Sequence, residues 1–139
     1  MNFLGSHILS ISQFDKGDVT ELFRVADEIE PYAQRVKHTR VLDGAILGNL
    51  FFEPSTRTRT SFEIAGKRLS ADVINISGAA SSTVKGESLI DTVKNLEAMN
   101  PDILVVRHNC SGAPALVTQF VNKPVINAGD GTHEHPSQS

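Results

Sequence analysis

The chain has 139 residues, which fits one domain with a sizeable core. Apolar residues make up 40% of the chain and charged residues 21%, and the net charge of −3 gives no basic field that would attract nucleic acid. No apolar run approaches the roughly 20 residues that span a bilayer, and residues 1–14 lack the basic start and apolar centre of a signal peptide. The single Cys110 excludes an internal disulfide, which favours a reducing, cytoplasmic setting. From the charge and the short apolar runs we expect a protein that binds neither nucleic acid nor a membrane.

A first helix is predicted to follow residues 1–14, which have the mixed character of an arm or a short strand. Asp15 is a suitable N-cap, and Asp18 three residues later completes a capping pattern before apolar residues recur at helical spacing. Pro31 should break or kink this helix, with a further turn or two to about His38. We expect this helix to serve packing only.

From residue 45 onwards, predicted strands and helices alternate. The expected strands are 45–52, 71–76, 102–107 and 124–127. Three helices are expected: one that ends near Leu69, one at 88–99 and one at 113–121. The small polar residues of 77–87 predict a mobile loop. This alternation predicts an α/β fold, a three-layer, doubly wound parallel sheet of about four strands with helices on both faces.

The most informative stretch is the turn from the first strand into its helix. Ser55, Thr56 and Thr58 supply hydroxyl donors there, and Arg57 supplies a planar fork that suits phosphate or carboxylate. A helix N-terminus adds unpaired N–H groups and partial positive charge, so the turn predicts an oxyanion site. The alternative is an N-cap with a solvated basic turn, but a cap requires one hydroxyl rather than three.

Polar groups also follow the other predicted strands. Ser81 and Lys85 come after the second strand, Arg107 ends the third, and His135 and Gln138 come after the fourth. Ligands of such sheets bind beyond the carboxyl ends of the strands, so we expect these residues to gather around a small phosphorylated ligand. We expect a helix to begin near His135 and to point further donors into the same crevice. The simpler alternative for Arg107 is an ion pair that caps its strand.

Signatures of other chemistries are missing from the sequence. No carboxylate pair or Ser-His-Asp grouping with a suitable spacing suggests covalent catalysis, and no Gly-x-x-x-x-Gly-Lys-Ser/Thr loop suggests a nucleoside triphosphatase. His133 and His135 lie two residues apart, without a supporting cysteine or a better-spaced third ligand. We therefore expect neither a metal nor a cofactor.

Four ordered motifs resemble those of the aspartate and ornithine carbamoyltransferases. The stretch 51–59, followed by Ser-Phe-Glu at 61–63, is similar to the carbamoyl phosphate signature of that family. The motifs 84–88, 106–108 and 135–138 continue the match in the expected order. The segments 85–87, 107–108 and 127–131 resemble the aspartate branch more than the ornithine branch, and Ser137 stands where a threonine is often found. The resemblance covers nearly the whole chain.

The resemblance implies that residues 1–139 form a carbamoyl-phosphate-binding domain and that a second, amino-acid-binding domain is absent from this chain. It implies that the phosphate is held by Ser55, Thr56, Arg57, Thr58 and Arg107. Arg57, Thr58 and His135 would polarise the carbonyl, and Gln138 would hold the carbamoyl amino group. The aspartate amine would then attack the carbonyl, phosphate would leave, and N-carbamoyl-L-aspartate would form in de novo pyrimidine biosynthesis.

The resemblance also implies a homotrimer, with Ser81 and Lys85 entering the active site of a neighbouring subunit, and it allows a larger assembly with regulatory or other pathway chains. The alternative for this loop is a solvated segment with a surface lysine. Because the absent half selects the acceptor, an ornithine or other carbamoyltransferase domain is a further alternative, as is a non-catalytic assembly module of the same fold. We expect the 139 residues alone to bind carbamoyl phosphate weakly and to turn over little aspartate.

Overall fold

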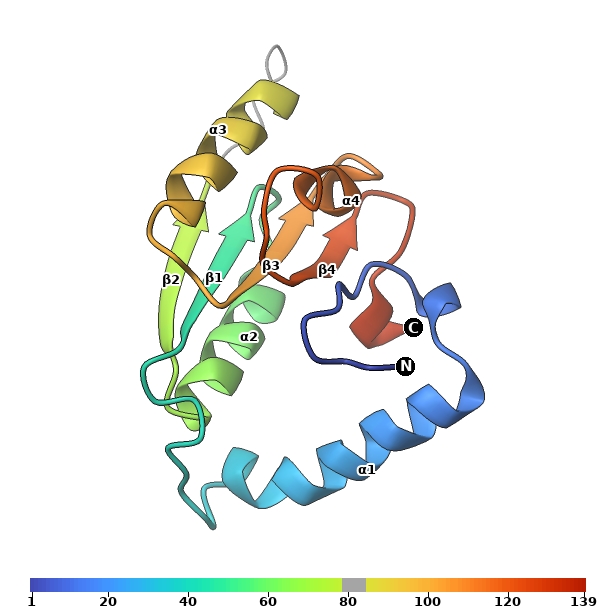
Figure 1. Ribbon diagram of the computed structural model, residues 1–139, viewed down its shortest axis with the longest axis vertical. Helices are drawn as coiled ribbons and strands as arrows, with labels where there is room; N and C mark the ends of the chain where they lie inside the picture. Colours follow the sequence, from blue (N-terminus) through green and yellow to red (C-terminus); the bar gives the residue numbers. More distant parts are fainter. Residues whose placement is uncertain (79–84) are drawn as a thin grey trace.

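A single parallel sheet forms the centre of the computed structural model, which describes residues 1–78 and 85–139, the side chains of 85–88 excepted (Figure 1). Its strands are β1 (Ile46–Phe51), β2 (Asp72–Ser77), β3 (Ile103–His108) and β4 (Val125–Asp130). They lie in the order β2-β1-β3-β4, and every pairing is parallel. The predicted α/β sheet of about four strands is therefore confirmed, with strand ends displaced by one to three residues.

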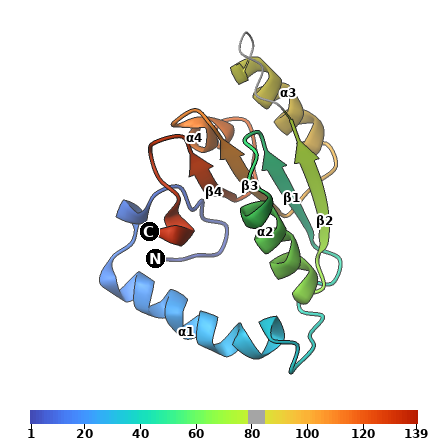
Figure 2. The same cartoon turned by 180° about the vertical axis from the view of Figure 1, so that it is seen from behind.

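Helices cover both faces of this sheet, as predicted. The helix α2 (Thr56–Arg68) lies on one face, whereas α3 (Lys85–Glu97) and α4 (Ala113–Val117) lie on the other (Figures 1 and 2). Side chains alternate between the faces along each strand, so Leu50 packs with α3 and α4, and Phe51 packs with Phe62 of α2. Both central strands bury consecutive residues, 48–51 of β1 and 104–106 of β3, which explains why most of these positions are apolar.

The helix α1 (Lys16–Ala33) extends beyond the sheet and contacts α2 (Figure 2). Asp15 and Asp18 form the expected capping box at its start. The helix continues through Pro31, and the predicted extension to His38 is wrong. The backbone of Arg35 adopts a left-handed conformation with φ of 62°, which ends the helix.

Two predicted boundaries also differ on the other face. The helix α3 begins at Lys85, three residues before the predicted start, and α4 ends at Val117 instead of at residue 121. The Ser81 of the predicted loop lies outside the described residues, and so does the side chain of Lys85. No role predicted for these two side chains is therefore tested by the structure.

The N-terminal residues run beside β4, at the edge of the sheet. Ile8 forms a parallel bridge with Ile126, its N–H donates to Val125 O at 2.8 Å, and its carbonyl accepts from Asn127 N at 2.7 Å. A 3₁₀ turn, η1 (Ile11–Gln13), then leads to α1. Within the described residues, none of the helices has the length and the apolar content that a bilayer crossing requires.

Candidate functional site

The strand order changes direction between β1 and β3, because β2 lies on one side of β1 and β3 lies on the other. Ligands of doubly wound folds bind at this point, outside the carboxyl ends of the strands. A hollow of about 650 Å³ lies there. Its lining comprises Phe51, Phe52, Glu53, Pro54, Ser55, Thr56, Arg59, Ser77, Gly78 and Asn109. Ser55 and Thr56 therefore lie at the predicted edge of the sheet.

A second hollow of about 310 Å³ lies between α2 and the C-terminal turn. Its lining comprises Arg57, Thr58, Ser61, Phe62, Ala65, His135, Ser137 and Gln138. The fold thus brings Arg57 and Thr58 beside His135 and Gln138, although more than 70 residues separate the two pairs in sequence. Thr58 is buried and Arg57 is exposed.

Residues 52–55 connect the end of β1 to the start of α2. Ser55 occupies the N-cap position, yet its hydroxyl makes no capping hydrogen bond within the described part of the chain. A role confined to capping therefore does not describe this hydroxyl. The first N–H groups of α2, which no preceding turn can pair, lie next to it.

Arg107 comes from the end of β3 and lies against β4. Its Nη1 donates to Ala128 O at 3.0 Å, and its Nη2 lies 3.4 Å from Glu53 Oε1. The guanidinium lies over Gly129, whose φ is 123°, and a Cβ at that position would lie 2.9 Å from Nη1. The ion pair with Glu53 agrees with the simpler interpretation, but Nε is buried and has no hydrogen-bond partner among residues 1–78 and 85–139. One donor of Arg107 is therefore not used by the described protein.

His135 precedes a short 3₁₀ turn, η2 (Pro136–Gln138), which stands where a helix was expected. Its Nδ1 lies 3.1 Å from Ser137 Oγ, and its Nε2 is buried without a hydrogen-bond partner in the described ranges. Burial, and then the positive charge of Arg107, lower the pKa of His135 below its ordinary value. The imidazole is therefore neutral at pH 7, with Arg107 close enough to affect its charge.

Sequence reasoning assigned no role to a group of buried polar residues on β4, the strand that leads to His135. Asn127 and Asp130 of β4 are 1% and 2% exposed, and their side chains hydrogen bond to each other at 3.2 Å. A signal for this group was present in the sequence. Asn127 and Asp130 are polar residues in a mainly apolar stretch, and Gly129 and Gly131 flank Asp130. Each of these two glycines has a positive φ, which an L side chain rarely adopts.

Comparisons with known proteins agree with this arrangement. Residues 6–139 match the family described as aspartate/ornithine carbamoyltransferase, carbamoyl-P binding domain. The aspartate carbamoyltransferase catalytic subunit of Syntrophotalea carbinolica is 55% identical over 140 residues, which cover 100% of this chain and 45% of that relative. The corresponding subunit of Syntrophus aciditrophicus is 57% identical over 125 residues, which cover 87% of this chain and 41% of that relative.

Solved structures give the same result. The Trypanosoma cruzi aspartate transcarbamoylase in complex with phosphate superimposes with a TM-score of 0.88 at 37% identity, over 96% of this chain and 42% of that one. The catalytic subunit of M. Jannaschii aspartate transcarbamoylase superimposes with a TM-score of 0.85 at 41% identity, over 96% of this chain and 44% of that one. This chain spans less than half the length of these relatives. It belongs to the aspartate/ornithine carbamoyltransferase family and matches the carbamoyl-phosphate-binding domain of that family.

Proposed function

We propose that this chain is the carbamoyl-phosphate-binding half of an aspartate carbamoyltransferase that acts in the cytoplasm, in de novo pyrimidine biosynthesis. The observation that carries the proposal is the pair of buried, unpartnered nitrogens, Arg107 Nε and His135 Nε2, among the residues that the structure describes. Buried polar atoms in proteins almost always have a partner, so such a pair at the ligand-binding edge of the sheet favours a polar ligand. The similarity to aspartate carbamoyltransferases supports carbamoyl phosphate as the ligand.

The proposed phosphate site combines backbone and side-chain donors. It consists of Ser55 and Thr56 from the first hollow, Arg57 and Thr58 from the second, and the first N–H groups of α2. Arg107, which lines neither hollow, would join them from the end of β3. A helix N-terminus binds phosphate through its free N–H groups and its dipole, and guanidinium groups add charge-assisted bonds. The net charge of the chain is negative, so the affinity arises from this local arrangement.

The carbonyl of carbamoyl phosphate would lie between Arg57, Thr58 and His135. If the Ser137 hydroxyl donates to His135 Nδ1, the proton of the neutral imidazole is on Nε2, which then donates to the carbonyl oxygen. The uncharged amine of aspartate attacks the carbonyl carbon, the bond from that carbon to the phosphate oxygen breaks, and phosphate leaves with its electron pair. The proton lost by the amine is available to the departing phosphate. Stabilising the developing oxyanion is the main catalytic contribution of these donors.

The remaining roles in the reaction are divided between this chain and a second domain. Gln138 is proposed to hold the carbamoyl amino group, and a second domain outside this chain would bind the aspartate carboxylates. A relative from Trypanosoma cruzi, 37% identical, was solved in complex with carbamoyl phosphate and aspartate, which supports this substrate pair. The mechanism requires positioning and electrostatic stabilisation and uses neither a metal nor a cofactor.

The test is an acceptor assay on the full-length protein that contains this chain. We expect carbamoyl transfer from carbamoyl phosphate to aspartate but not to ornithine. Transfer to ornithine alone would assign the protein to the ornithine branch. If the folded protein formed no product with either aspartate or ornithine, a non-catalytic assembly module would be favoured. The 139-residue chain, assayed in parallel, should form little product, because it holds only one of the two substrate sites.

We also propose a homotrimer in which Ser81 and Lys85 act in the site of a neighbouring subunit. Its test mixes two inactive full-length variants, Arg57→Ala and Lys85→Ala. Subunit exchange would create sites with neither substitution, so activity should return in the mixture. No recovery at any ratio, under conditions in which exchange is demonstrated, would contradict a shared site.

A further inference from the structure

Asp130 ends β4 as a carboxylate surrounded by hydrogen-bond donors. Its Oδ2 accepts from Gly112 N at 3.0 Å, and its Oδ1 accepts from Glu134 N at 3.0 Å and from Asn127 Nδ2 at 3.2 Å. The ring nitrogen Nδ1 of His133 lies 2.9 Å from Oδ2. With only 2% of the residue exposed, these partners replace the water that would otherwise solvate the charge.

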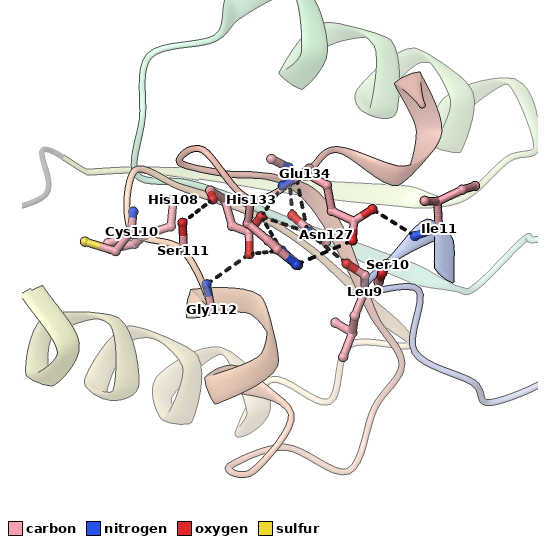
Figure 3. A network of polar contacts seen from close by, with 12 residues as sticks. Leu9, Ser10, Ile11, His108, Cys110, Ser111, Gly112, Asn127, His133 and Glu134 are labelled. Atoms are coloured by element: carbon pink, nitrogen blue, oxygen red, sulfur yellow. Dashed lines mark hydrogen bonds and ion pairs between the residues drawn. The ribbon is translucent and has the colours of Figure 1, made fainter. Parts of the chain in front are cut away.

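The partners of Asp130 come from separate segments of the chain. Gly112 belongs to the loop after β3, Asn127 belongs to β4, and Glu134 belongs to the turn that leads to His135. In Figure 3, Asn127 lies between Gly112 and Glu134, which approach it from opposite sides. The backbone repeats the connection, because Gly131 N donates to His108 O at 3.0 Å. Asp130 therefore joins the loop after β3 to the turn after β4.

The same network reaches the N-terminal segment. Glu134 Oε2 accepts from Ile11 N at 2.9 Å, and Asn127 Nδ2 also lies within 3.0 Å of Leu9 O. The turn that precedes His135 is thus fixed on one side by the loop after β3 and on the other by residues 9–11 (Figure 3).

The carboxylate is the charged form at neutral pH. Burial alone would raise the pKa of Asp130, but the donors on Gly112, Glu134, Asn127 and His133 outweigh it and hold this pKa below its ordinary value. A buried carboxylate with this many donors holds its partners in place, because removing it would leave several buried N–H groups without an acceptor.

We propose that Asp130 is a positioning residue of the carbamoyl phosphate site, which fixes the turn 131–134 and thereby places His135 on the hollow that it shares with Arg57. This inference rests on the proposed function. Residues 131–133 are exposed, so little apolar packing holds the turn, and its conformation depends on the hydrogen bonds to Asp130. Displacing a catalytic group by about 1 Å can reduce the rate by about 100-fold.

The contrasting possibility is that Asp130 stabilises the fold and has no effect on the site. A variant would then be less stable, but its folded fraction would keep the normal turnover and the normal His135. Positioning predicts a change in the folded fraction itself. The two possibilities are therefore separated by measurements on folded protein.

The experiment uses Asp130→Asn in the full-length protein. Asparagine has nearly the same shape, but its NH₂ group faces N–H donors and its charge is gone. We expect kcat to fall by about 10- to 100-fold, whereas KM for carbamoyl phosphate changes less, because the proposed phosphate donors on α2 and β3 do not belong to the turn. The His135 resonance, followed by NMR, should titrate closer to the ordinary pKa of histidine, because a loosened imidazole regains water and moves from Arg107.

Asp18→Asn is the matched control. Asp18 is also a buried aspartate that accepts backbone and terminal N–H groups, but it lies on α1. This control should lose stability while keeping kcat and the His135 titration of the unaltered protein. If Asp130→Asn yields too little folded protein, His133→Ala removes the exposed ring whose Nδ1 lies 2.9 Å from Asp130 Oδ2, and kcat should fall by a few-fold.

Unchanged kcat and unchanged His135 titration in folded Asp130→Asn, or in His133→Ala where that variant replaces it, would overturn the inference. Absence of carbamoyl transfer in the unaltered full-length protein would instead overturn the proposed function. The His135 titration would still decide whether Asp130 positions the turn, because it requires no activity.

Discussion

The two sides of the second hollow are positioned in different ways. Arg57 and Thr58 belong to the first turn of α2. Regular backbone hydrogen bonds and the short connection from β1 therefore determine where they lie. His135 and Gln138 belong to a turn whose place is set by side-chain contacts around Asp130. Changes on the first side should therefore remove chemistry and leave the structure intact. On the second side, residues that never touch the substrate should also affect the rate.

The largest expected effect tests the first side. Arg57→Ala in the full-length protein should lower kcat/KM by about 100- to 1,000-fold, because a charge-assisted donor to the developing oxyanion is lost. The unfolding temperature should hardly change, since the side chain is exposed. Steady-state kinetics and calorimetry measure both quantities.

Arg24→Ala is a suitable control for the Arg57 experiment. Arg24 is another exposed arginine, and it pairs with Glu21 and Glu28 on α1. Its removal should leave kcat/KM within about 2-fold of the unaltered value, because surface ion pairs contribute little. If Arg57→Ala also kept its activity, the α2 turn would not be part of the site.

The next effect concerns Arg107, whose guanidinium lies against Gly129 and whose charge lowers the pKa of His135. Gly129→Ala should weaken carbamoyl phosphate binding by about 10- to 100-fold, because the new Cβ would lie 2.9 Å from Nη1 and displace the guanidinium. The strain of a positive φ adds a loss of stability of about 1–2 kcal/mol. Isothermal titration calorimetry and thermal unfolding measure the two effects separately.

Gly44→Ala separates strain from displacement. Gly44 has a φ of 87°, but nothing lies within 4 Å of a Cβ at that position. This control should lose a similar amount of stability and should bind carbamoyl phosphate normally. Equal binding by both alanine variants would show that Arg107 does not depend on Gly129.

The sequence predicted the first side of the site better than the second. The apolar run before Glu53 and the helical spacing after Thr58 are local signals, and both elements lie where they were expected. The role of Asp130 depends on Gly112, Asn127 and Glu134, which only the folded chain brings together. No local pattern encodes such a convergence.

The fold follows the same rule. The sheet and its covering helices could be predicted, because apolar periodicity records which faces are buried. The end of β4 was missed because Gly129 and Asp130 are poor strand formers that tertiary contacts hold in the strand. The end of α1 was missed because it depends on the left-handed backbone of Arg35, which is not a residue that usually marks such a stop.

A pH profile sharpens the comparison on the second side. The lowered pKa of His135 keeps the imidazole neutral at pH 7, so its donor role should be constant from neutral to alkaline pH. As the pH falls through this pKa, which lies below the ordinary value of about 6.5, Nδ1 takes up a proton and the charged ring is repelled by Arg107. The imidazolium should then leave its position in the site, so kcat/KM should fall by about tenfold per pH unit. The unaltered protein and the Asp130→Asn variant should differ in the position of this acid limb. An acid limb at the ordinary histidine pKa in the unaltered protein would contradict the buried environment.

The smallest expected effect tests the tautomer of His135. Ser137→Ala removes the hydroxyl that lies 3.1 Å from Nδ1, so the imidazole proton is no longer directed to Nε2, and kcat should fall by about 3- to 10-fold. Ser137→Thr retains the hydroxyl and should remain within about 2-fold of the unaltered protein. Ser139→Ala is a further control, since its hydroxyl donates to the backbone carbonyl of His135 and cannot select the tautomer. Should all three variants have equal kcat, Ser137 would not orient the imidazole, and the position of His135 would rest on the contacts around Asp130 alone.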